Sequence, residues 1–277
     1  MSNAIAVYHG QFGRASLYNL DHDLATHAHR EGHLTFYVQG RPSTMVVQND
    51  VITMDPTTAV AINPWEPHAF ETGDPERGSL CLVLYIKPIW FLETARNAQS
   101  WLRFGRSRIE MSSQIQRSMG VIVSLLLEGE ESSLFDGYLY ELTRECFDQS
   151  WQWTPGGAPR LDCASPFTDF RVRKSMRLMS EKLGEEFELD DVAREAGLSR
   201  PHFYKLFRKQ TGLTPNLFLN TLRMERAIES LTSTEKSVTS IGFDLGFSSQ
   251  ASFTRFFTSN VGIAPSDYRR VAHLALN

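Results

Sequence analysis

The residues with the most distinctive chemistry are histidines near the amino terminus. Six of the eight histidines lie within the first 68 of 277 residues. His27 and His29 stand two positions apart, so in a strand they would point to the same face. His33 follows shortly after, and His68 ends the run NPWEPH. Imidazole nitrogens bind zinc, nickel, copper or iron, and they also hydrogen-bond carboxylates and hydroxyl groups. The pattern predicts a cluster that holds a metal ion or a small polar molecule.

A second set of polar residues lies in a duplicated segment near the carboxyl terminus. The runs 190–215 and 240–265 each contain a short helical pattern, a glycine turn and a second helix with spaced phenylalanines. This is the pattern of a helix-turn-helix, whose second helix enters the DNA major groove. The residues that recur fifty positions apart are Phe203, Lys205, Phe207, Gly212 and Pro215, then Phe253, Arg255, Phe257, Gly262 and Pro265.

The faces opposite the phenylalanines are the predicted DNA-reading faces, because the aromatic rings must turn toward the core. Lys205 and Tyr204 are the best candidate base readers of the first helix. In the second helix Gln250 suits an adenine edge and Arg255 a guanine edge, each bidentate contact giving about 1–3 kcal/mol of discrimination. The complete predicted DNA-binding set is Ser199, Arg200, Pro201, His202, Tyr204, Lys205, Ser249, Gln250, Ala251, Thr254 and Arg255.

The segment from about Val192 to Arg270 resembles the DNA-binding domain of the AraC/XylS transcriptional regulators. The resemblance rests on the two copies, on LRMERA at 222–227 and on GIAPSDYR at 262–269. It implies two helix-turn-helix subdomains joined by one long helix from about Pro215 to Leu231, with base contacts at the outward positions named above. Pro201 and Ala251 depart from that pattern, because neither side chain donates a hydrogen bond and only apolar contact with a thymine methyl remains. Ser199, Ser249 and nearby backbone amides are expected to hold phosphates.

The histidine segment has a resemblance of its own. HAHREGHLTFYVQG at 27–40 resembles the first cupin motif, and NPWEPH at 63–68 resembles the second. Metal-binding cupins would use counterparts of His27, His29 and His68 plus a glutamate, whose place His33 takes here. Regulators with this barrel commonly act as small-molecule receptors without metal. Three interpretations of the histidines are therefore retained: a metal site, an effector site, or side chains that only satisfy strand-end hydrogen bonds. Trp65 and Tyr37 are candidate walls of the effector pocket.

The elements that must position these residues define the expected fold class, a multidomain α+β protein. Strand-like runs at 34–38, 45–47, 59–62 and 80–86 predict a small all-β barrel or jelly roll. Apolar stripes at 115–126 and 135–146 predict a helical hairpin. The expected domains are a cupin-like sensor barrel at 1–92, the hairpin with a dimerisation role at 93–150, a linker at 151–167, and an all-α double helix-turn-helix domain at 168–277.

Composition narrows the class of protein. Net charge is −4, with +3 from residue 167 onward and −7 before it, which suits site-restricted DNA binding better than general coating of nucleic acid. No apolar run reaches the ~18 residues of a membrane span, and no secretion signal is recognisable. Cys81, Cys146 and Cys163 lack metal-binding or paired spacing, which favours reduced thiols in the cytoplasm. Neither a nucleophile triad nor a phosphate-binding glycine loop is recognisable.

The sequence therefore predicts a cytoplasmic, sequence-specific transcriptional regulator, not an enzyme and not a membrane protein. Its expected partners are double-stranded DNA, a small-molecule effector, RNA polymerase and a second copy of the chain, and the resemblance favours activation. No cofactor is required, although a divalent transition metal in the barrel is an alternative. The runner-up function is a metal-binding cupin sensor or a cupin enzyme, an oxygenase or isomerase, tethered to a DNA-binding domain. A third is a constitutive or architectural regulator with an empty barrel.

Overall fold

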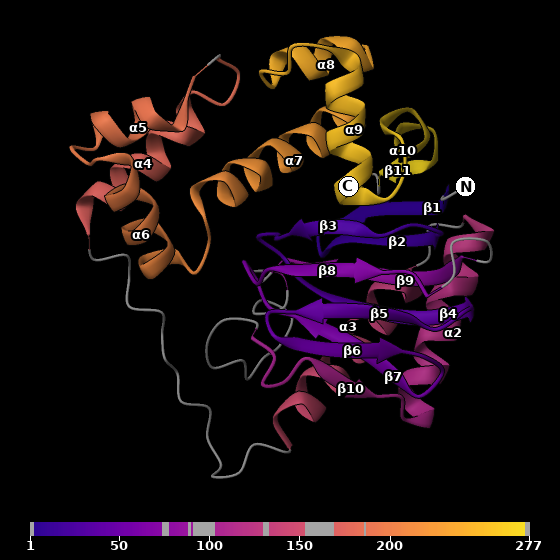
Figure 1. The fold of residues 1–277 in the computed structure, drawn as a ribbon. Helices are drawn as coiled ribbons and strands as arrows, with labels where there is room; N and C mark the ends of the chain where they lie inside the picture. Colours follow the sequence, from indigo (N-terminus) through magenta and orange to yellow (C-terminus); the bar gives the residue numbers. More distant parts are fainter. Residues whose placement is uncertain are drawn as a thin grey trace. The chain divides into compact units, whose positions relative to one another are not determined.

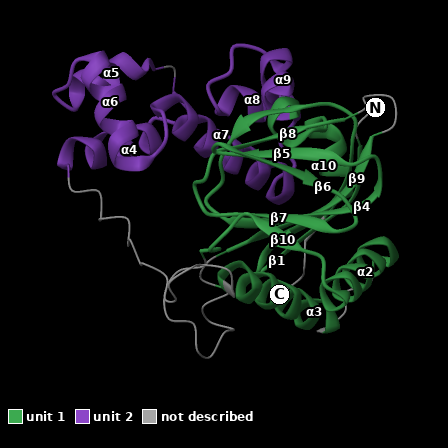
Figure 2. Ribbon diagram, turned by 60° about the horizontal axis from the view of Figure 1, so that its bottom comes forward, with its two compact units in different colours: residues 1–159, 258–277 green, residues 160–257 purple. Residues whose placement is uncertain are grey.

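The computed structural model describes residues 3–73, 78–87, 90, 103–129, 133–152, 169–185 and 187–274. The chain divides into two compact units, which Figure 2 colours separately. One contains residues 1–159 together with 258–277, and we call it the β-sheet unit. The other contains residues 160–257, and we call it the helical unit. In the part of the chain that the structure describes, no helix is both long and apolar enough to cross a bilayer.

The β-sheet unit is built on two sheets, as Figure 1 shows. The larger has the order β10-β7-β4-β9-β2-β1-β11 and the smaller β3-β8-β5-β6. All pairings are antiparallel except that of β11 with β1. The strands are β1 Asn3–Gly10, β2 Gly13–Leu20, β3 Leu24–His27, β4 Gly32–Gly40, β5 Ser43–Val47, β6 Asp50–Met54, β7 Thr58–Ile62, β8 His68–Glu71, β9 Ser79–Ile86, β10 Arg108–Glu110 and β11 Ala272–Leu274.

These sheets confirm the predicted sheet-rich amino-terminal domain, and each of the four predicted strand runs lies within a strand. The runs 34–38, 45–47 and 59–62 belong to β4, β5 and β7, and 80–86 belongs to β9. β7 and β9 are buried almost throughout and β4 is buried over its first five residues, because the sheet they share is covered on both faces there.

Two helices, α2 Ser113–Glu128 and α3 Ser133–Gln152, pack on the larger sheet and complete the unit's core. Ile115, Ile122 and Leu126 on α2 meet Leu139 and Leu142 on α3 in one buried cluster with residues of the sheet. Burying a side chain of this size contributes about 1.5–3 kcal/mol to folding. The predicted hairpin is thus formed. Residues 151–152 of the predicted linker end α3, and 153–167 lie outside the described residues, so the predicted domain boundaries stay predictions.

The carboxyl-terminal region is helical and repeats the predicted unit. Gly212 ends α6 with φ 76°, a left-handed conformation that suits glycine, and Thr214 caps the next helix by accepting a hydrogen bond from the Leu217 amide. Phe203, Phe207, Phe253 and Phe257 are fully buried, as expected of core anchors. The helices are α4 Phe170–Glu181, α5 Leu189–Glu195, α6 Arg200–Thr211, α7 Pro215–Ser233, α8 Val238–Asp244 and α9 Gln250–Val261, followed in the β-sheet unit by α10 Pro265–Val271.

Candidate DNA-reading helices and histidine cluster

The first candidate reading helix is α6, which follows α5 across a turn containing Gly197 in a left-handed conformation with φ 73°. Its predicted DNA-facing residues form one outward face. Tyr204 is half-buried and its hydroxyl accepts a hydrogen bond from Asn216 Nδ2 at 3.3 Å. Ser199 begins the helix as its N-cap. The exposed members of the face are Ser199, Arg200, Pro201, His202 and Lys205.

The second candidate reading helix is α9, which repeats the arrangement after the turn at Gly246, where φ is 78°. Gln250, Ala251 and Arg255 are exposed, while Ser249 and Thr254 are half-buried. Ser249 Oγ accepts a hydrogen bond from the Ser252 amide at 3.1 Å, so this hydroxyl caps the helix. Sequence reasoning predicted phosphate binding there and missed the cap.

A residue outside the predicted set orients one of the predicted base readers. Thr239 on α8 donates a hydrogen bond from Oγ1 to Gln250 Oε1 at 2.6 Å. The bond fixes the plane of the carboxamide and leaves its Nε2 hydrogens and one Oε1 lone pair for a partner. Only the folded packing of α8 beside α9 reveals this role.

Cations on the two reading faces differ in their partners. Arg200 donates to Asp190 Oδ2 at 3.0 Å and lies over the Tyr204 ring. Among the described residues, neither Lys205 nor Arg255 has an ion-pair or hydrogen-bond partner from the protein. An exposed cation that no carboxylate neutralises is available to a nucleic-acid phosphate or a guanine edge. At the equivalent positions 205 and 255, the two helices therefore present an uncommitted positive charge.

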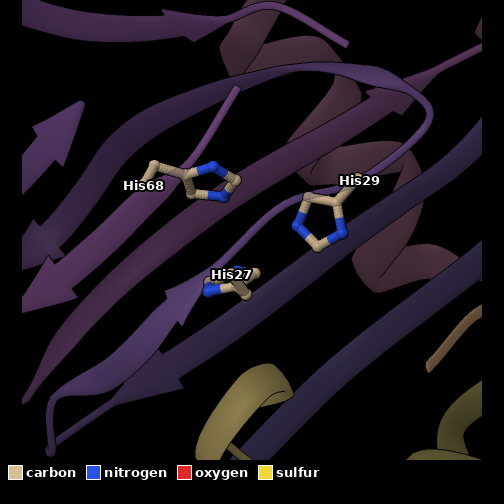
Figure 3. Close-up of side chains that lie close together, drawn as sticks. All are labelled: His27, His29 and His68. Carbon is tan, nitrogen blue, oxygen red and sulfur yellow. The ribbon is translucent and has the colours of Figure 1, made fainter. Parts of the chain in front are cut away.

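In the β-sheet unit the predicted histidines do come together. His27 lies opposite His68 in the pairing of β3 with β8, and their ring centroids are 4.4 Å apart. The His29 ring lies 4.8 Å from that of His27 and 5.2 Å from that of His68. One ligand nitrogen from each of the three lies within 4.8 Å of the others. Figure 3 shows the three rings turned toward one space.

The backbone around His29 differs from the prediction. β3 ends at His27, so His29 lies in the following loop and not on the same strand face. The loop is held by the Trp65 amide, which donates to the His29 carbonyl at 2.6 Å. Trp65 has φ 63°, an unusual left-handed conformation for a bulky residue and one that clusters at functional sites. This cross-loop bond, not strand periodicity, brings His29 to the cluster.

Hydrogen bonds to backbone carbonyls define the tautomers of two of these rings. His27 Nδ1 lies 2.6 Å from the Ala25 carbonyl and His68 Nδ1 lies 2.8 Å from the Glu66 carbonyl. Because a carbonyl oxygen can only accept, both Nδ1 atoms carry the hydrogen and both Nε2 atoms keep a lone pair. His68 Nε2 and His29 Nε2 are buried, and within the described part of the chain no hydrogen-bond partner reaches them.

Burial keeps all of these imidazoles neutral near pH 7. Desolvation lowers the pKa of His27 to about 4, opposed in part by its bond to the Ala25 carbonyl. The pKa values of His29 and His68 fall well below the ordinary range for the same first reason, and the neighbouring histidines lower them further. The cluster therefore offers uncharged nitrogen ligands.

His33 adjoins the cluster without joining the three-ligand group. Its ring centroid lies 4.5 Å from that of His68 and 5.3 Å from that of His29, and it occupies the start of β4. Its Nδ1 is buried, and no described group bonds to it. The structure places the fourth predicted histidine beside the site and gives it a different geometry from the other three.

The two predicted aromatic walls lie at different places. The Trp65 ring is half-buried beneath Arg30, whose Cζ is 5.6 Å from the ring centroid. Tyr37 lies four residues along β4 from His33, and at about 3.3 Å per residue its Cα is about 13 Å away. Its hydroxyl donates to the Gly40 carbonyl at 2.8 Å. The structure associates Trp65 with the histidine loop and gives Tyr37 no contact of this kind within the described residues.

Sequence reasoning missed Arg14 and Tyr85. The Tyr85 ring lies 5.0 Å from His29 and 5.2 Å from His33, and the Arg14 guanidinium stacks over it at 3.7 Å. Arg14 is 8% exposed, and it donates to the Tyr268 hydroxyl on α10 at 3.3 Å. The single arginine in the strand GRASLYNL was the available signal, since arginine is almost never fully buried unless it is paired.

Cysteine chemistry is excluded for the two described thiols. Burial raises the pKa of Cys81 to about 12, and the pKa of Cys146 is raised for the same first reason. Both are free and buried, as the prediction of reduced thiols requires, and such thiols are inert. Cys163 lies outside the described residues.

Comparison with known proteins gives a consistent result for the helical repeat. Residues 192–271 match a family described as a helix-turn-helix domain. The chain is 37% identical over 99 residues to the transposon Tn10 TetD protein of Escherichia coli, a match that covers 36% of this chain and 72% of TetD. It is 32% identical over 100 residues to the transcriptional activator RhaS of Escherichia coli, covering 36% of each chain. It spans between 34% and 40% of the length of other curated relatives.

Solved structures extend the likeness to the whole fold. Apo ToxT from Vibrio cholerae superposes with a TM-score of 0.59 at 16% identity, covering 93% of this chain and 96% of that one. ToxT with a bound unsaturated fatty acid gives a TM-score of 0.52, also at 16% identity, covering 98% and 95% of the two chains. At this identity the likeness concerns the fold: a sheet-rich amino-terminal part followed by a helical helix-turn-helix region.

Proposed function

The chain belongs to the AraC/XylS family of transcriptional regulators, and on that basis we propose that it controls transcription in response to a small molecule. In this proposal α6 and α9 read two adjacent major-groove segments. The observation that carries it is the pair of equivalent helices, each anchored by two buried phenylalanines and each presenting an uncommitted cation, Lys205 or Arg255.

The residues on each helix take distinct roles. Arg255 and Gln250 contact base edges through bidentate hydrogen bonds, and Lys205 and Tyr204 are their counterparts on α6. The exposed side chains of Pro201 and Ala251 offer only apolar contact. Ser199, Ser249 and the adjoining amides hold phosphates and fix the register on DNA.

The histidine cluster is the proposed effector site. Buried nitrogen atoms that lack protein partners are costly unless a ligand satisfies them, and His29 and His68 each contribute one. That ToxT is seen with a bound unsaturated fatty acid supports a small-molecule site in a protein of this fold. His29→Ala should therefore abolish the response to the effector while leaving DNA affinity intact.

Coupling from the site to DNA binding would run through Arg14. Its guanidinium bonds the Tyr268 hydroxyl, and His9 Nε2 lies 2.9 Å from the same hydroxyl. Tyr268 is on α10, which follows α9 after a short turn. An anionic effector that draws Arg14 away would weaken this anchor of α10, and binding shifts the equilibrium only through such differential contacts.

Activation, dimer formation and RNA polymerase contact complete the proposal. RhaS is named a transcriptional activator, which supports the same sign of action here. Leu127 near the end of α2 is 59% exposed and Leu134 near the start of α3 is 62% exposed, which supports a role for this hairpin in pairing two copies. The second candidate function, a cupin oxygenase or isomerase tethered to DNA, is favoured by the three converging imidazoles, and substrate turnover would distinguish it.

The experiment that tests the proposal is selection of bound sequences from a random DNA library, followed by footprinting of the enriched site. Two protected half-sites about one helical turn apart are expected. Lys205→Ala and Arg255→Ala should each relax one half-site. Lys236→Ala, which removes an exposed lysine bonded to Asp244 outside both reading helices, is the matched control. Enrichment of no sequence by the wild-type protein would overturn the proposal.

A further inference from the structure

Two of the three converging imidazoles, those of His27 and His68, present lone pairs and not hydrogen-bond donors to the space between the rings. The Nδ1 hydrogens of His27 and His68 are already given to the Ala25 and Glu66 carbonyls. The Nε2 atoms of these neutral rings can only accept. A carboxylate or phosphate would meet the lone pairs of these two nitrogens and be repelled. The occupant of this space must accept electron pairs.

The surroundings favour a metal ion over a hydrogen-bond donor. The three ligand nitrogens lie within 4.8 Å of one another, so a single atom can touch all of them after small rotations of the rings. Two Nδ1–H groups bonded to backbone carbonyls are also the usual outer support of metal-binding histidines, because they orient the ring and raise its basicity. A hydroxyl or ammonium donor would not require this supported arrangement.

We propose that His27, His29 and His68 bind one divalent transition metal ion, and that the metal is where the effector of the proposed regulator attaches. Imidazole ligands suit zinc, copper, iron and nickel. Three protein ligands leave at least one coordination position open to an exogenous ligand. This inference rests on the proposed function only for the role of the effector.

The charges around the site indicate the chemical class of that ligand. None of the three metal ligands is anionic, and Arg14 adds a buried positive charge on the Tyr85 ring beside His29. Glu66 and Glu31 each stand two residues from a ligand in sequence. The Glu66 oxygens accept from the Asn63 amide and from Gln48 Nε2, and the Glu31 carboxylate interacts electrostatically with Arg14. A divalent ion beside Arg14 therefore favours an oxygen anion at the open position, so the effector class is a small carboxylate.

The test uses the full-length protein after removal of bound metal with a chelator. Titration with Co²⁺ and Zn²⁺ is followed by calorimetry and, for Co²⁺, by visible absorption. The expected result is saturable binding of one ion. Substituting any of His27, His29 or His68 by Ala should weaken it by about 10-fold or more. His22→Ala, which removes a histidine 39% exposed beside Asp21, should leave it unchanged.

Two further measurements keep the inference falsifiable if a cluster variant fails to fold. Pulsed electron paramagnetic resonance of the wild-type Cu²⁺ protein should detect coordinated imidazole nitrogens, and their absence would overturn the site. Acetate and citrate should shift the visible bands of the Co²⁺ protein, and Arg14→Gln should reduce that shift; unchanged bands would overturn the carboxylate class.

DNA binding by the same preparations separates failure of the metal site from failure of the proposed function. Absence of one-ion binding by the wild-type protein, or equal loss in His22→Ala and His68→Ala, would overturn the metal site. Retained footprints in that case would leave the regulator proposal intact. One-ion binding without any selected DNA site would contradict the regulator and leave the metal site standing.

Discussion

The two candidate sites of this molecule are assembled in opposite ways. Each DNA-reading face consists of neighbouring residues on one helix, most of them exposed, and the arrangement is repeated fifty positions later. In the histidine cluster His27 and His68 are buried and His29 is half-buried, and the pairing of β3 with β8 places His27 opposite His68. The first kind of site depends on local periodicity, and the second on long-range strand pairing. Perturbations should therefore act on the two sites separately.

Replacing a core phenylalanine should have the largest effect, a loss of stability of the helical unit. Phe207 is fully buried, with its ring 5.6 Å from Phe203 and 5.5 Å from Phe218. Phe207→Ala should lower the free energy of unfolding of this unit by about 3–5 kcal/mol, through lost burial and the cavity that remains. DNA binding should disappear, which an electrophoretic shift assay with the selected site would measure.

The spectroscopic design of this experiment uses the distribution of tryptophan. All five tryptophans lie between residues 65 and 153, so tryptophan fluorescence reports on the β-sheet unit alone. Far-UV circular dichroism at the helical signal should show the lowered transition, whereas fluorescence should melt as in the wild type. Phe243→Ala, which truncates a ring 54% exposed, is the control. Equal shifts in both signals would contradict the separation of the two units.

Lowering the pH should instead destabilise the β-sheet unit first. The unfolded chain takes up a proton on His27 near pH 6.5, but the folded chain resists until about pH 4. Stability is therefore lost as pH falls through that window. At pH 5 the loss from His27 alone is about 2 kcal/mol, because each unit of pKa difference corresponds to about 1.4 kcal/mol.

The acid effect is measured by urea unfolding at pH 7.5, 6 and 5 with fluorescence detection. His29, His33 and His68, whose pKa values are also lowered, add to the loss in the same direction. A His27→Gln protein should show a shallower dependence of stability on pH. A flat profile for the wild type would mean that the imidazoles are not held neutral by burial, and would remove the basis of a neutral nitrogen cluster.

The same contrast explains how much of the molecule the sequence could predict. Recurrence of Phe203 and Phe207 as Phe253 and Phe257 predicted the core anchors and, by exclusion, the outward faces, because helical periodicity is a local property. The stripe through Ile115 predicted α2 for the same reason. Capping of α9 by Ser249 and the bond from Thr239 to Gln250 were missed, since both depend on the packing of side chains.

The β-sheet unit was predictable in its strands but less so in its site. The histidines were found by their type, yet the strand argument for His29 was wrong, because a bond from the Trp65 amide positions that loop. Arg14 and Tyr85 reach the cluster only through pairing of β2 with β9 and of β4 with β9. Strand order is not encoded in spacing along the chain, so these neighbours could not be inferred from it.

Replacing a base-reading arginine should have a smaller and more specific effect than destabilising the core of either unit. Arg255 is exposed on α9, so Arg255→Ala should leave unfolding unchanged. Discrimination should fall by about 1–3 kcal/mol at one base position, and binding of sites changed at that position should become equal. Affinities measured on a set of single-base variants would show this. An equal loss on every sequence, with a reduced salt dependence, would instead identify a phosphate contact.

The smallest predicted effect tests whether α8 assists α9 in reading DNA. Thr239→Val removes the hydroxyl that donates to Gln250 Oε1 while keeping the shape of the side chain. The freed carboxamide must be ordered on binding, so we expect a loss of about 0.5–1.5 kcal/mol, the worth of one hydrogen bond. The loss should be confined to the base position that Gln250→Ala affects. In the double variant the two losses should not add, because Thr239 acts only through Gln250. Additive losses would show that Thr239 contacts DNA itself, and the reading face would then include α8.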